Sequence, residues 1–360
     1  MATTFSLLRA GWLFLLVLGI LYMLFLTALA VPVLQRAVQY AHVVRLPYVS
    51  WLQKPEMLGF APGRVHSMFL PTADGQIVHT WHIRPLHSSS KGSLVDSTSH
   101  LVVYFHGNAG TLASQGRRDF FHAASALPNT HVLAIDYRGF GQSSGSPSEE
   151  GLILDGLAAV QWALDQGIDP SRIAIVGQSL GSAVCIATAE RLASMNIHVK
   201  ALVLIAGFTS VPDLLSTFRN GGVFSILGPL QNYPLLQKWL INTFVLDKWD
   251  SANRLHLLVP KLSTETSILI IHAHNDFHIP YSHSVQLYET ARALVPHDLS
   301  KNEMSGVDKH FSLERAGKQV VKFVETSFGG HNQVQNTDAS IIAIGKALGV
   351  LHDSFTYTYT

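Results

Sequence analysis

Cysteine is nearly absent from this sequence, since its 360 residues include a single one, Cys185. One thiol cannot form an internal disulfide, and a metal site built from cysteine ligands is excluded. Charged residues are also scarce, at 14% of the chain, where soluble proteins carry about a quarter. We therefore expect either a membrane segment or an unusually apolar surface.

Neither sign of charge predominates, because 25 basic residues stand against 24 acidic ones, a formal net charge of +1. This balance gives no reason to expect a nucleic-acid partner. The Asn-x-Ser/Thr sequon is absent as well, so glycosylation cannot be used to assign the chain to a lumen. The length allows one large domain or two ordinary ones, and the oligomeric state stays open.

A long apolar run lies near the N-terminus, where residues 10–34 carry no formal charge. About 20 apolar residues are enough to span a bilayer as a helix. Residues 28–30, Ala-Leu-Ala, also fit a signal-peptide cleavage site, but the apolar part of such a peptide is about 7–15 residues long. We predict a membrane anchor over residues 1–36 and a connector over 37–60. The alternative is a secreted protein released by cleavage.

Strand and helix patterns alternate after this connector. Residues 65–70 and 76–83 alternate apolar and polar side chains on either side of a turn signal, which indicates an antiparallel hairpin. Short apolar runs typical of strands buried on both faces follow at 101–105, 131–135, 172–176, 201–206 and 267–273. Helical patterns lie at 148–166, 180–195, 284–294 and 311–326. This order predicts an α/β protein with a mostly parallel sheet and helices on both faces.

An insertion interrupts the alternation between Phe208 and Thr266, where about sixty residues separate two core strands. A connection of this kind usually has about 2–6 residues. The insertion, residues 208–266, contains apolar stretches at 223–230 and 235–246. Both a packed extra helical layer and a lid over an apolar site fit this composition.

The chemistry is suggested first by Gly177-Gln178-Ser179-Leu180-Gly181, which lies between a buried strand and a helical pattern. The pattern Gly-x-Ser-x-Gly in this context is a nucleophile elbow, a turn so tight that Gly177 and Gly181 must lack side chains. A helix N-cap in a glycine-rich turn would account for Ser179, but not for the paired glycines. We therefore predict that Ser179 is a nucleophile.

A serine nucleophile needs a histidine base, and that base needs a carboxylate to orient it. Asp276 directly follows the strand at 267–273, at the sheet edge where α/β proteins place their sites. His310 comes 34 positions later, before the helix expected at 311–326. The order serine, acid, histidine is the one found in α/β hydrolases, so we predict the triad Ser179, Asp276 and His310.

Other histidines compete for this role, because the chain has 19 of them. His297 falls where the final strand is expected, and His331 and His352 lie in the polar C-terminal tail, residues 329–360. Four more surround Asp276, at His272, His274, His278 and His283. They straddle a strand end and a proline turn rather than one helix or hairpin, so we expect no metal site. We expect no cofactor either.

Acyl transfer also needs donors that bind the developing oxyanion. The loop His106-Gly107-Asn108-Ala109-Gly110 follows the strand at 101–105, where this fold supplies one backbone N–H. We place that donor at Asn108 and the second at Leu180, directly after the nucleophile. A phosphate-binding loop would need a lysine and a spacing that this segment lacks.

Four segments together resemble a known family: YFHGNAG, AIDYRGFGQSSGSPSEEG, VGQSLGSAV and HAHNDFHIP, all behind one N-terminal apolar segment. They resemble the abhydrolase domain-containing twelve branch of the α/β hydrolases and its fungal relatives. The resemblance implies an eight-stranded α/β-hydrolase domain over residues 61–328, with the insertion as a helical cap. It also implies that Asp136-Tyr137-Arg138-Gly139 is a structural turn, and that the anchor is a single span, in the endoplasmic reticulum. The tail has no counterpart in this family: a short amphipathic helix over residues 339–355 and a dispensable tail are equally good interpretations.

The resemblance implies a serine hydrolase that cleaves a lipid ester, a monoacylglycerol or a lysophospholipid, at a membrane. An acyl-protein thioesterase and a serine peptidase are alternatives on the same fold. A membrane-tethered scaffold without activity is an alternative of another class, because fold does not fix function.

Overall fold

The structure is a computed structural model that describes residues 2–45, 49–86, 93–217, 227–295, 299–305, 308–315 and 319–352. Its strands are β1 (Val65–Pro71), β2 (Ile77–Ile83), β3 (His100–Phe105), β4 (Thr130–Ile135), β5 (Ile173–Gln178), β6 (Ala201–Ile205), β7 (Ser267–Ala273), β8 (Leu299–Ser305), β9 (Asp308–Arg315) and β10 (Gln319–Thr326). Its α-helices are α1 (Ala2–Leu29), α2 (Pro32–Tyr40), α3 (Gln115–Ala124), α4 (Glu149–Asp165), α5 (Leu180–Ser194), α6 (Val211–Thr217), α7 (Pro234–Phe244), α8 (Ser251–Leu258), α9 (Ser282–Ala293), α10 (Gly330–Gln333) and α11 (Asp338–Leu348).

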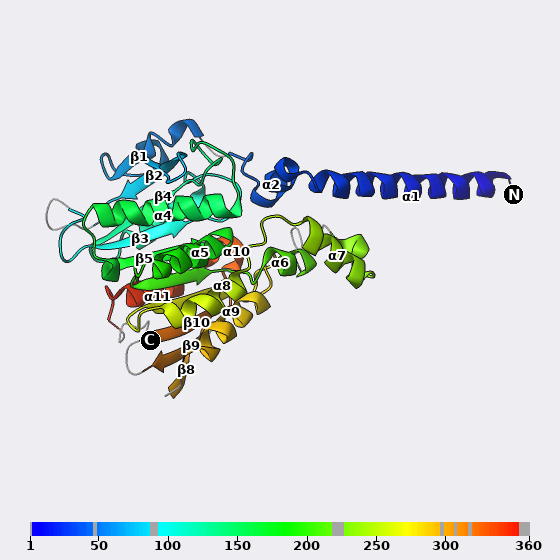
Figure 1. The fold of residues 1–360 in the computed structure, drawn as a ribbon. Helices are drawn as coiled ribbons and strands as arrows, with labels where there is room; N and C mark the ends of the chain where they lie inside the picture. Colours follow the sequence, from blue (N-terminus) through cyan, green and yellow to red (C-terminus); the bar gives the residue numbers. More distant parts are fainter. Residues whose placement is uncertain are drawn as a thin grey trace.

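One sheet organises the domain, in the order β1-β2-β4-β3-β5-β6-β7-β10-β9-β8 (Figure 1). The first eight strands in this order form the expected mostly parallel sheet, in which β4, β3, β5, β6, β7 and β10 run parallel. The predicted hairpin is present as β1 and β2, which pair antiparallel. Beyond β10, the strands β9 and β8 extend the sheet in antiparallel orientation. The predicted α/β fold is therefore confirmed, with two further strands at one edge.

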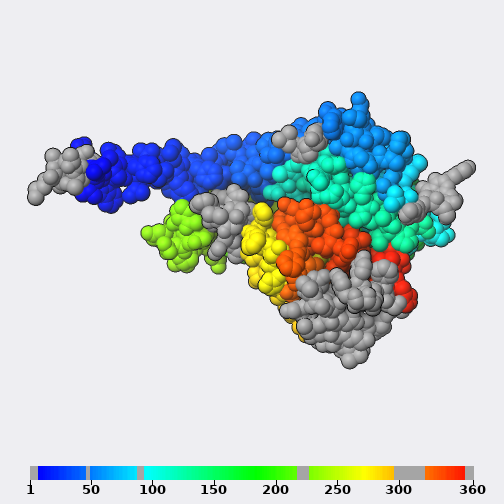
Figure 2. Space-filling view, turned by 180° about the vertical axis from the view of Figure 1, so that it is seen from behind, coloured from blue at the N-terminus to red at the C-terminus, as the bar shows by residue number. Residues whose placement is uncertain are grey.

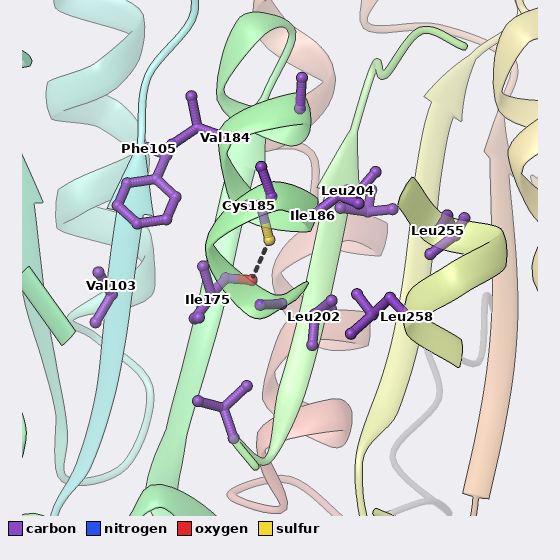
Figure 3. Packing of buried hydrophobic residues seen from close by; sticks show 14 of the residues in the cluster. Val103, Phe105, Ile175, Val184, Cys185, Ile186, Leu202, Leu204, Leu255 and Leu258 are labelled. Atoms are coloured by element: carbon purple, nitrogen blue, oxygen red, sulfur yellow. Dashed lines mark hydrogen bonds between the residues drawn. The ribbon is translucent and has the colours of Figure 1, made fainter. Parts of the chain in front are cut away.

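Helices cover both faces of the sheet, as the alternating pattern predicts. The predicted helices at 148–166, 180–195 and 284–294 are α4, α5 and α9. On one face α5 packs between α4 and α8 over β5 and β6. Figure 3 shows Cys185 within this layer, where its thiol donates to the carbonyl oxygen of Ile175 at 3.4 Å. Burial raises the pKa of this thiol, so Cys185 is a small apolar core residue without chemistry of its own.

The helix expected at residues 311–326 is wrong, because the structure has β9 and β10 there. The segment QVVKFVET (319–326) is rich in β-branched side chains and pairs with β7 from Val321 to Thr326. Val321, Phe323 and Val324 are buried, so β10 is covered on both faces as an interior strand is. Tertiary pairing, which a local pattern does not report, selects the strand.

The expected boundary at residue 328 is also wrong, since the C-terminal segment belongs to the domain. The predicted amphipathic helix is present as α11, which packs against β7 and β10. Val334, Ile344 and Leu348 are buried in the core on that face of the sheet. Residues 329–352 thus complete the helical layer opposite α5 rather than forming a separate tail.

The insertion at 208–266 consists of two parts with different packing. Its second part, α8, is a core helix, because Leu255 and Leu258 are fully buried against the layer of α5. Its first part contains α6, whose Val211 is buried in the core, and α7, which projects from the domain (Figure 1). The extra packed layer is thus correct for α8. The first half of the expected apolar stretch at 223–230 lies outside the described residues.

The N-terminal apolar run forms α1, which projects from the body of the domain (Figures 1 and 2). Residues 7–29 have a mean hydropathy of 2.5, and none of their most apolar window is buried against protein. A core helix of a soluble domain would be covered, so this exposure makes α1 a candidate membrane span. The next helix, α2, connects α1 to the domain.

Candidate active site

The turn from β5 to α5 holds Ser179 in a conformation that few residues adopt, with φ at 54° and ψ at −119°. Its backbone N–H donates to the carbonyl oxygen of Ile205 at 2.9 Å. A Cβ on Gly177 would overlap the backbone of Gly181, and a Cβ on Gly181 would overlap the carbonyl oxygen of Phe105. The strained turn thus depends on both glycines, as expected of an elbow that presents a serine hydroxyl.

Ser179 faces a histidine and a carboxylate in one hydrogen-bonded chain. The hydroxyl lies 3.0 Å from Nε2 of His331, and Nδ1 of His331 lies 2.8 Å from Oδ2 of Asp276. Because the Asp276 carboxylate can only accept, Nδ1 of His331 carries the proton that is donated to it. Nε2 is then unprotonated and can accept a hydrogen bond from the Ser179 hydroxyl. This is the hydrogen-bond order of an activated serine nucleophile.

His331 therefore takes the position that the sequence predicts for His310. The structure brings Ser179 and Asp276 together as predicted, but His310 lies in β9, paired with Val324 of β10. Since β10 separates β9 from β7, and strands lie about 4.8 Å apart, the backbone of His310 lies roughly 10 Å beyond the strand that leads to Asp276. In the predicted triad, His310 would therefore lie on the far side of Asp276 from Ser179, which follows β5.

The error has an identifiable cause in the expected helix at 311–326. The histidine of this fold follows the last strand of the sheet, and that strand is β10. The first histidine after β10 is His331, in the turn Gly329-Gly330-His331, where both glycines have positive φ. Reading QVVKFVET as a buried strand would have identified His331 from sequence.

Two contacts of the surrounding backbone position this histidine. Gln178, the residue before the serine, donates from Nε2 to the carbonyl oxygen of His331 at 3.0 Å. Asn275, the residue before the acid, accepts from the backbone N–H of Gly330 at 2.8 Å. The turn that carries Ser179 and the turn that carries Asp276 are thus each hydrogen-bonded to the turn that carries His331.

Asp276 is supported by a second histidine that the sequence did not assign. Nε2 of His272 lies 3.2 Å from Oδ2 of Asp276 and 3.1 Å from the carbonyl oxygen of Ile279. With two acceptors there, Nε2 is the protonated nitrogen, and Nδ1 accepts from the hydroxyl of Ser284. Burial raises the pKa of Asp276, but hydrogen bonds from His272 and His331 outweigh it and hold the pKa below its ordinary value. The acid is therefore an anion at neutral pH.

The histidines near Asp276 point to different partners. His283 is bonded to the hydroxyl of Thr209 at 2.9 Å, and His274 is exposed beside Glu325. Within the described residues, no three histidine, cysteine or acidic side chains come together as metal ligands do.

The predicted oxyanion donors lie next to the serine. A Cβ on Gly107 would stand 3.3 Å from the Cβ of Ser179, so the loop at 106–110 abuts the nucleophile. Ala109 and Gly110 donate their N–H groups to the carbonyl oxygens of Tyr40 and Val44. In the described parts of the chain, the N–H groups of Asn108 and Leu180 donate to no protein acceptor, which leaves them available to a substrate oxygen.

A buried arginine sets the shape of this loop. The Arg117 guanidinium, on α3, donates to the carbonyl oxygens of Gly107, Asn108, Ala109 and Thr111 at 2.7–3.3 Å. These bonds fix the direction of the carbonyls, and because each peptide unit is planar they also fix the direction of the N–H group in the same unit, including that of Asn108. The predicted structural turn supports the same loop, since Asp136 Oδ1 accepts from the N–H of Leu112 at 3.0 Å.

The residues that sequence reasoning missed are thus His331, His272 and Arg117. Together with Ser179 and Asp276 they form a site with a serine hydroxyl, an imidazole bonded to it and a buried carboxylate, beside two N–H groups that have no acceptor among the described residues. Such an arrangement can attack a carbonyl carbon and stabilise the oxyanion that forms.

Comparison with known proteins also points to a hydrolase. Residues 100–238 match the family described as the alpha/beta hydrolase fold. The human protein named Protein ABHD12B is 30% identical over 268 residues, covering 70% of this chain and 68% of that protein. The zebrafish (Danio rerio) lysophosphatidylserine lipase ABHD12 is 29% identical over 269 residues, covering 72% and 67%. Among solved structures, an alpha-beta hydrolase from Vibrio vulnificus has a TM-score of 0.59 at 18% identity, covering 87% of this chain and 90% of that one.

The fold and site are those of an α/β hydrolase. This chain belongs to the ABHD12-type branch of that family, and it is an ester hydrolase by class.

Proposed function

We propose that this protein hydrolyses the carboxylic ester of a membrane lipid, a monoacylglycerol or a lysophospholipid, with Ser179, His331 and Asp276 as the triad. The observation that carries the proposal is the continuous hydrogen-bonded chain from the serine hydroxyl through His331 to Asp276. The zebrafish relative, named for lysophosphatidylserine, supports a lipid with one acyl chain.

The chemistry follows from the positions of these groups. His331 Nε2 takes the hydroxyl proton as Ser179 Oγ bonds to the ester carbonyl carbon, and Asp276 stabilises the imidazolium that forms. The N–H groups of Leu180 and Asn108 bind the oxyanion. His331 then gives its proton to the leaving alcohol oxygen, and the acyl group stays on Ser179. A water molecule, deprotonated by His331, repeats these steps and releases the fatty acid.

The position of the site relative to α1 supports a lipid substrate. The segment that follows α1 is bonded to the oxyanion loop, because Tyr40 and Val44 accept from Ala109 and Gly110 at 3.0 and 2.8 Å. Tyr40 is fully buried, and its hydroxyl accepts from the indole N–H of Trp249 at 3.1 Å. The segment that follows the candidate span is therefore hydrogen-bonded to the loop that we propose binds the oxyanion. We also propose that the span is retained in the endoplasmic reticulum.

The proposal is tested with the full-length protein and a fluorophosphonate probe, which reacts with activated serines. We expect wild-type protein to be labelled and Ser179→Ala to be unlabelled. Hydrolysis of monoacylglycerol, lysophospholipid, acyl-thioester and peptide substrates is then compared. Undiminished labelling of Ser179→Ala would refute the nucleophile, and activity confined to thioesters or peptides would refute the lipid ester.

A further inference from the structure

A row of apolar side chains on α7 is uncovered. The α7 face consists of five exposed residues on or beside this helix: Tyr233, Leu235, Leu236, Trp239 and Phe244. Leu235 is 85% exposed, as it would be in an unfolded chain. The opposite side of α7 is turned inward at Gln237 and Ile241, which are buried. The helix therefore exposes large apolar side chains to solvent, whereas a surface helix of a soluble protein usually turns them toward the core.

The position of α7 is fixed by the segment that leaves the candidate span. Gln35 of α2 donates to the carbonyl oxygen of Phe244 at 2.7 Å and accepts from the N–H of Leu246 at 2.9 Å. Arg36 pairs with Asp247 at 3.1 Å, and Gln39 donates to the carbonyl oxygen of the same residue. The C-terminal end of α7 is therefore bonded directly to α2.

The distance from α7 to the membrane follows from this attachment. Nε2 of Gln35 also donates to the carbonyl oxygen of Leu29, the last residue of α1, at 2.9 Å. The attachment point of α7 therefore lies at the end of the candidate span, at the level where interfacial helices bury their apolar face roughly 5–10 Å deep. Figures 1 and 2 show α7 projecting from the domain in the same direction as α1.

The sequence around α7 is poor in negative charge, which favours contact with a lipid surface. Residues 214–246 contain no aspartate or glutamate and two cations, Arg219 and Lys238. The first 55 residues also lack acidic side chains. Contact of these two segments with a lipid surface would therefore not require any of their side chains to bring a negative charge to it. Trp239 fits the same location, because tryptophan is enriched at the boundary between lipid and water.

We propose that the α7 face inserts into the outer part of the bilayer that α1 spans, as a second, monotopic contact. The domain then stands on the membrane at two points, α1 and α7, rather than turning freely about a single helix. Two contacts fix which side of the domain faces the lipid. That side is the carboxyl edge of the sheet, because Tyr40 and Val44 join α2 to the oxyanion loop. The consequence for turnover rests on the proposed function: a lipid ester reaches Ser179 from the bilayer without first entering water.

The insertion itself is tested independently of activity. Full-length Leu235→Cys is labelled with an environment-sensitive fluorophore and reconstituted into phosphatidylcholine vesicles that contain a spin-labelled phosphatidylcholine. The control is Val95→Cys, since Val95 is apolar, 58% exposed, and precedes β3 at the opposite edge of the sheet. Cys185 is buried and should stay unlabelled in both. We expect the spin-labelled lipid to quench Leu235→Cys at least threefold more than Val95→Cys, which an aqueous quencher should reach instead.

Equal quenching at the two positions would overturn the proposal. So would fluorescence that changes with the number of protein copies per vesicle, because the α7 face would then contact a second copy. In a second measurement, Leu235→Asn/Trp239→Asn should lose at least tenfold in hydrolysis of a monoacylglycerol in vesicles and keep its rate on a soluble short-chain ester. Val95→Gln should keep both rates. If wild-type protein hydrolysed neither ester, the proposed function would fail, while the quenching would still decide the insertion.

Discussion

The choice of His331 over His310 as the base is the sharpest consequence of the structure. His331→Ala removes both hydrogen bonds of the imidazole, at 3.0 Å to Ser179 and at 2.8 Å to Asp276. The serine stays in place, because its backbone N–H is held by Ile205 and Gln178 binds the backbone of residue 331. The variant therefore keeps the elbow and the oxyanion donors and loses proton transfer.

Loss of the base in a serine triad lowers kcat by about 10⁴–10⁶, which corresponds to roughly 5–8 kcal/mol in the activation barrier. We expect this loss in kcat for His331→Ala on a soluble ester, together with loss of fluorophosphonate labelling. His310→Ala should stay within a few-fold of wild type, because β9 lies beyond β10.

Thermal unfolding serves as the control for folding. The His331 side chain is only 12% exposed and bonds the buried carboxylate of Asp276, so its removal should lower the unfolding temperature somewhat, and a cooperative transition shows that the variant is folded. A His331→Ala variant with more than about one hundredth of the wild-type kcat, or an equal loss in His310→Ala, would refute the assignment.

Three further predictions concern the frame of the site. Gly181→Ala should abolish stable folding, because its Cβ would overlap a backbone oxygen of β3, whereas Gly116→Ala, whose Cβ would meet nothing within 3.7 Å, should fold normally in a thermal-unfolding assay. Arg117→Met should lower kcat by about 10²–10³, the effect of one lost oxyanion donor, with little change in KM; an unchanged kcat would show that the loop holds its shape unaided. Burial lowers the pKa of His82 to about 3 and, with nearby Arg84, that of His131 to about 4. Both histidines are thus neutral in the fold, and the stability they contribute is present above about pH 6.5 and lost as pH falls, by ~1.4 kcal/mol per pH unit for each. Denaturant unfolding between pH 7 and pH 4 should show this loss, and replacing both by glutamine should flatten it; an equally steep loss in that variant would contradict the cause.

The sequence by itself determined the parts whose signals are local. The elbow at Ser179 needs glycines at 177 and 181 because of contacts within one turn. Asp276 is placed by the apolar run before it, since a buried parallel strand ends at the edge where the site forms. The candidate span in α1 follows from composition alone, because a bilayer selects helices by length and hydropathy.

Tertiary structure decided what depends on pairing between distant segments. The strand β10 exists because it pairs with β7, and this pairing makes His331 rather than His310 the first histidine after the sheet. Arg117 and His272 give no local signal of a role, since their partners are carbonyls and a carboxylate brought near by folding. The division of the insertion into a buried α8 and an exposed α7 has the same origin: apolar composition is common to both, and only the attachment of α7 to α2 holds it at the end of the candidate span rather than in the core.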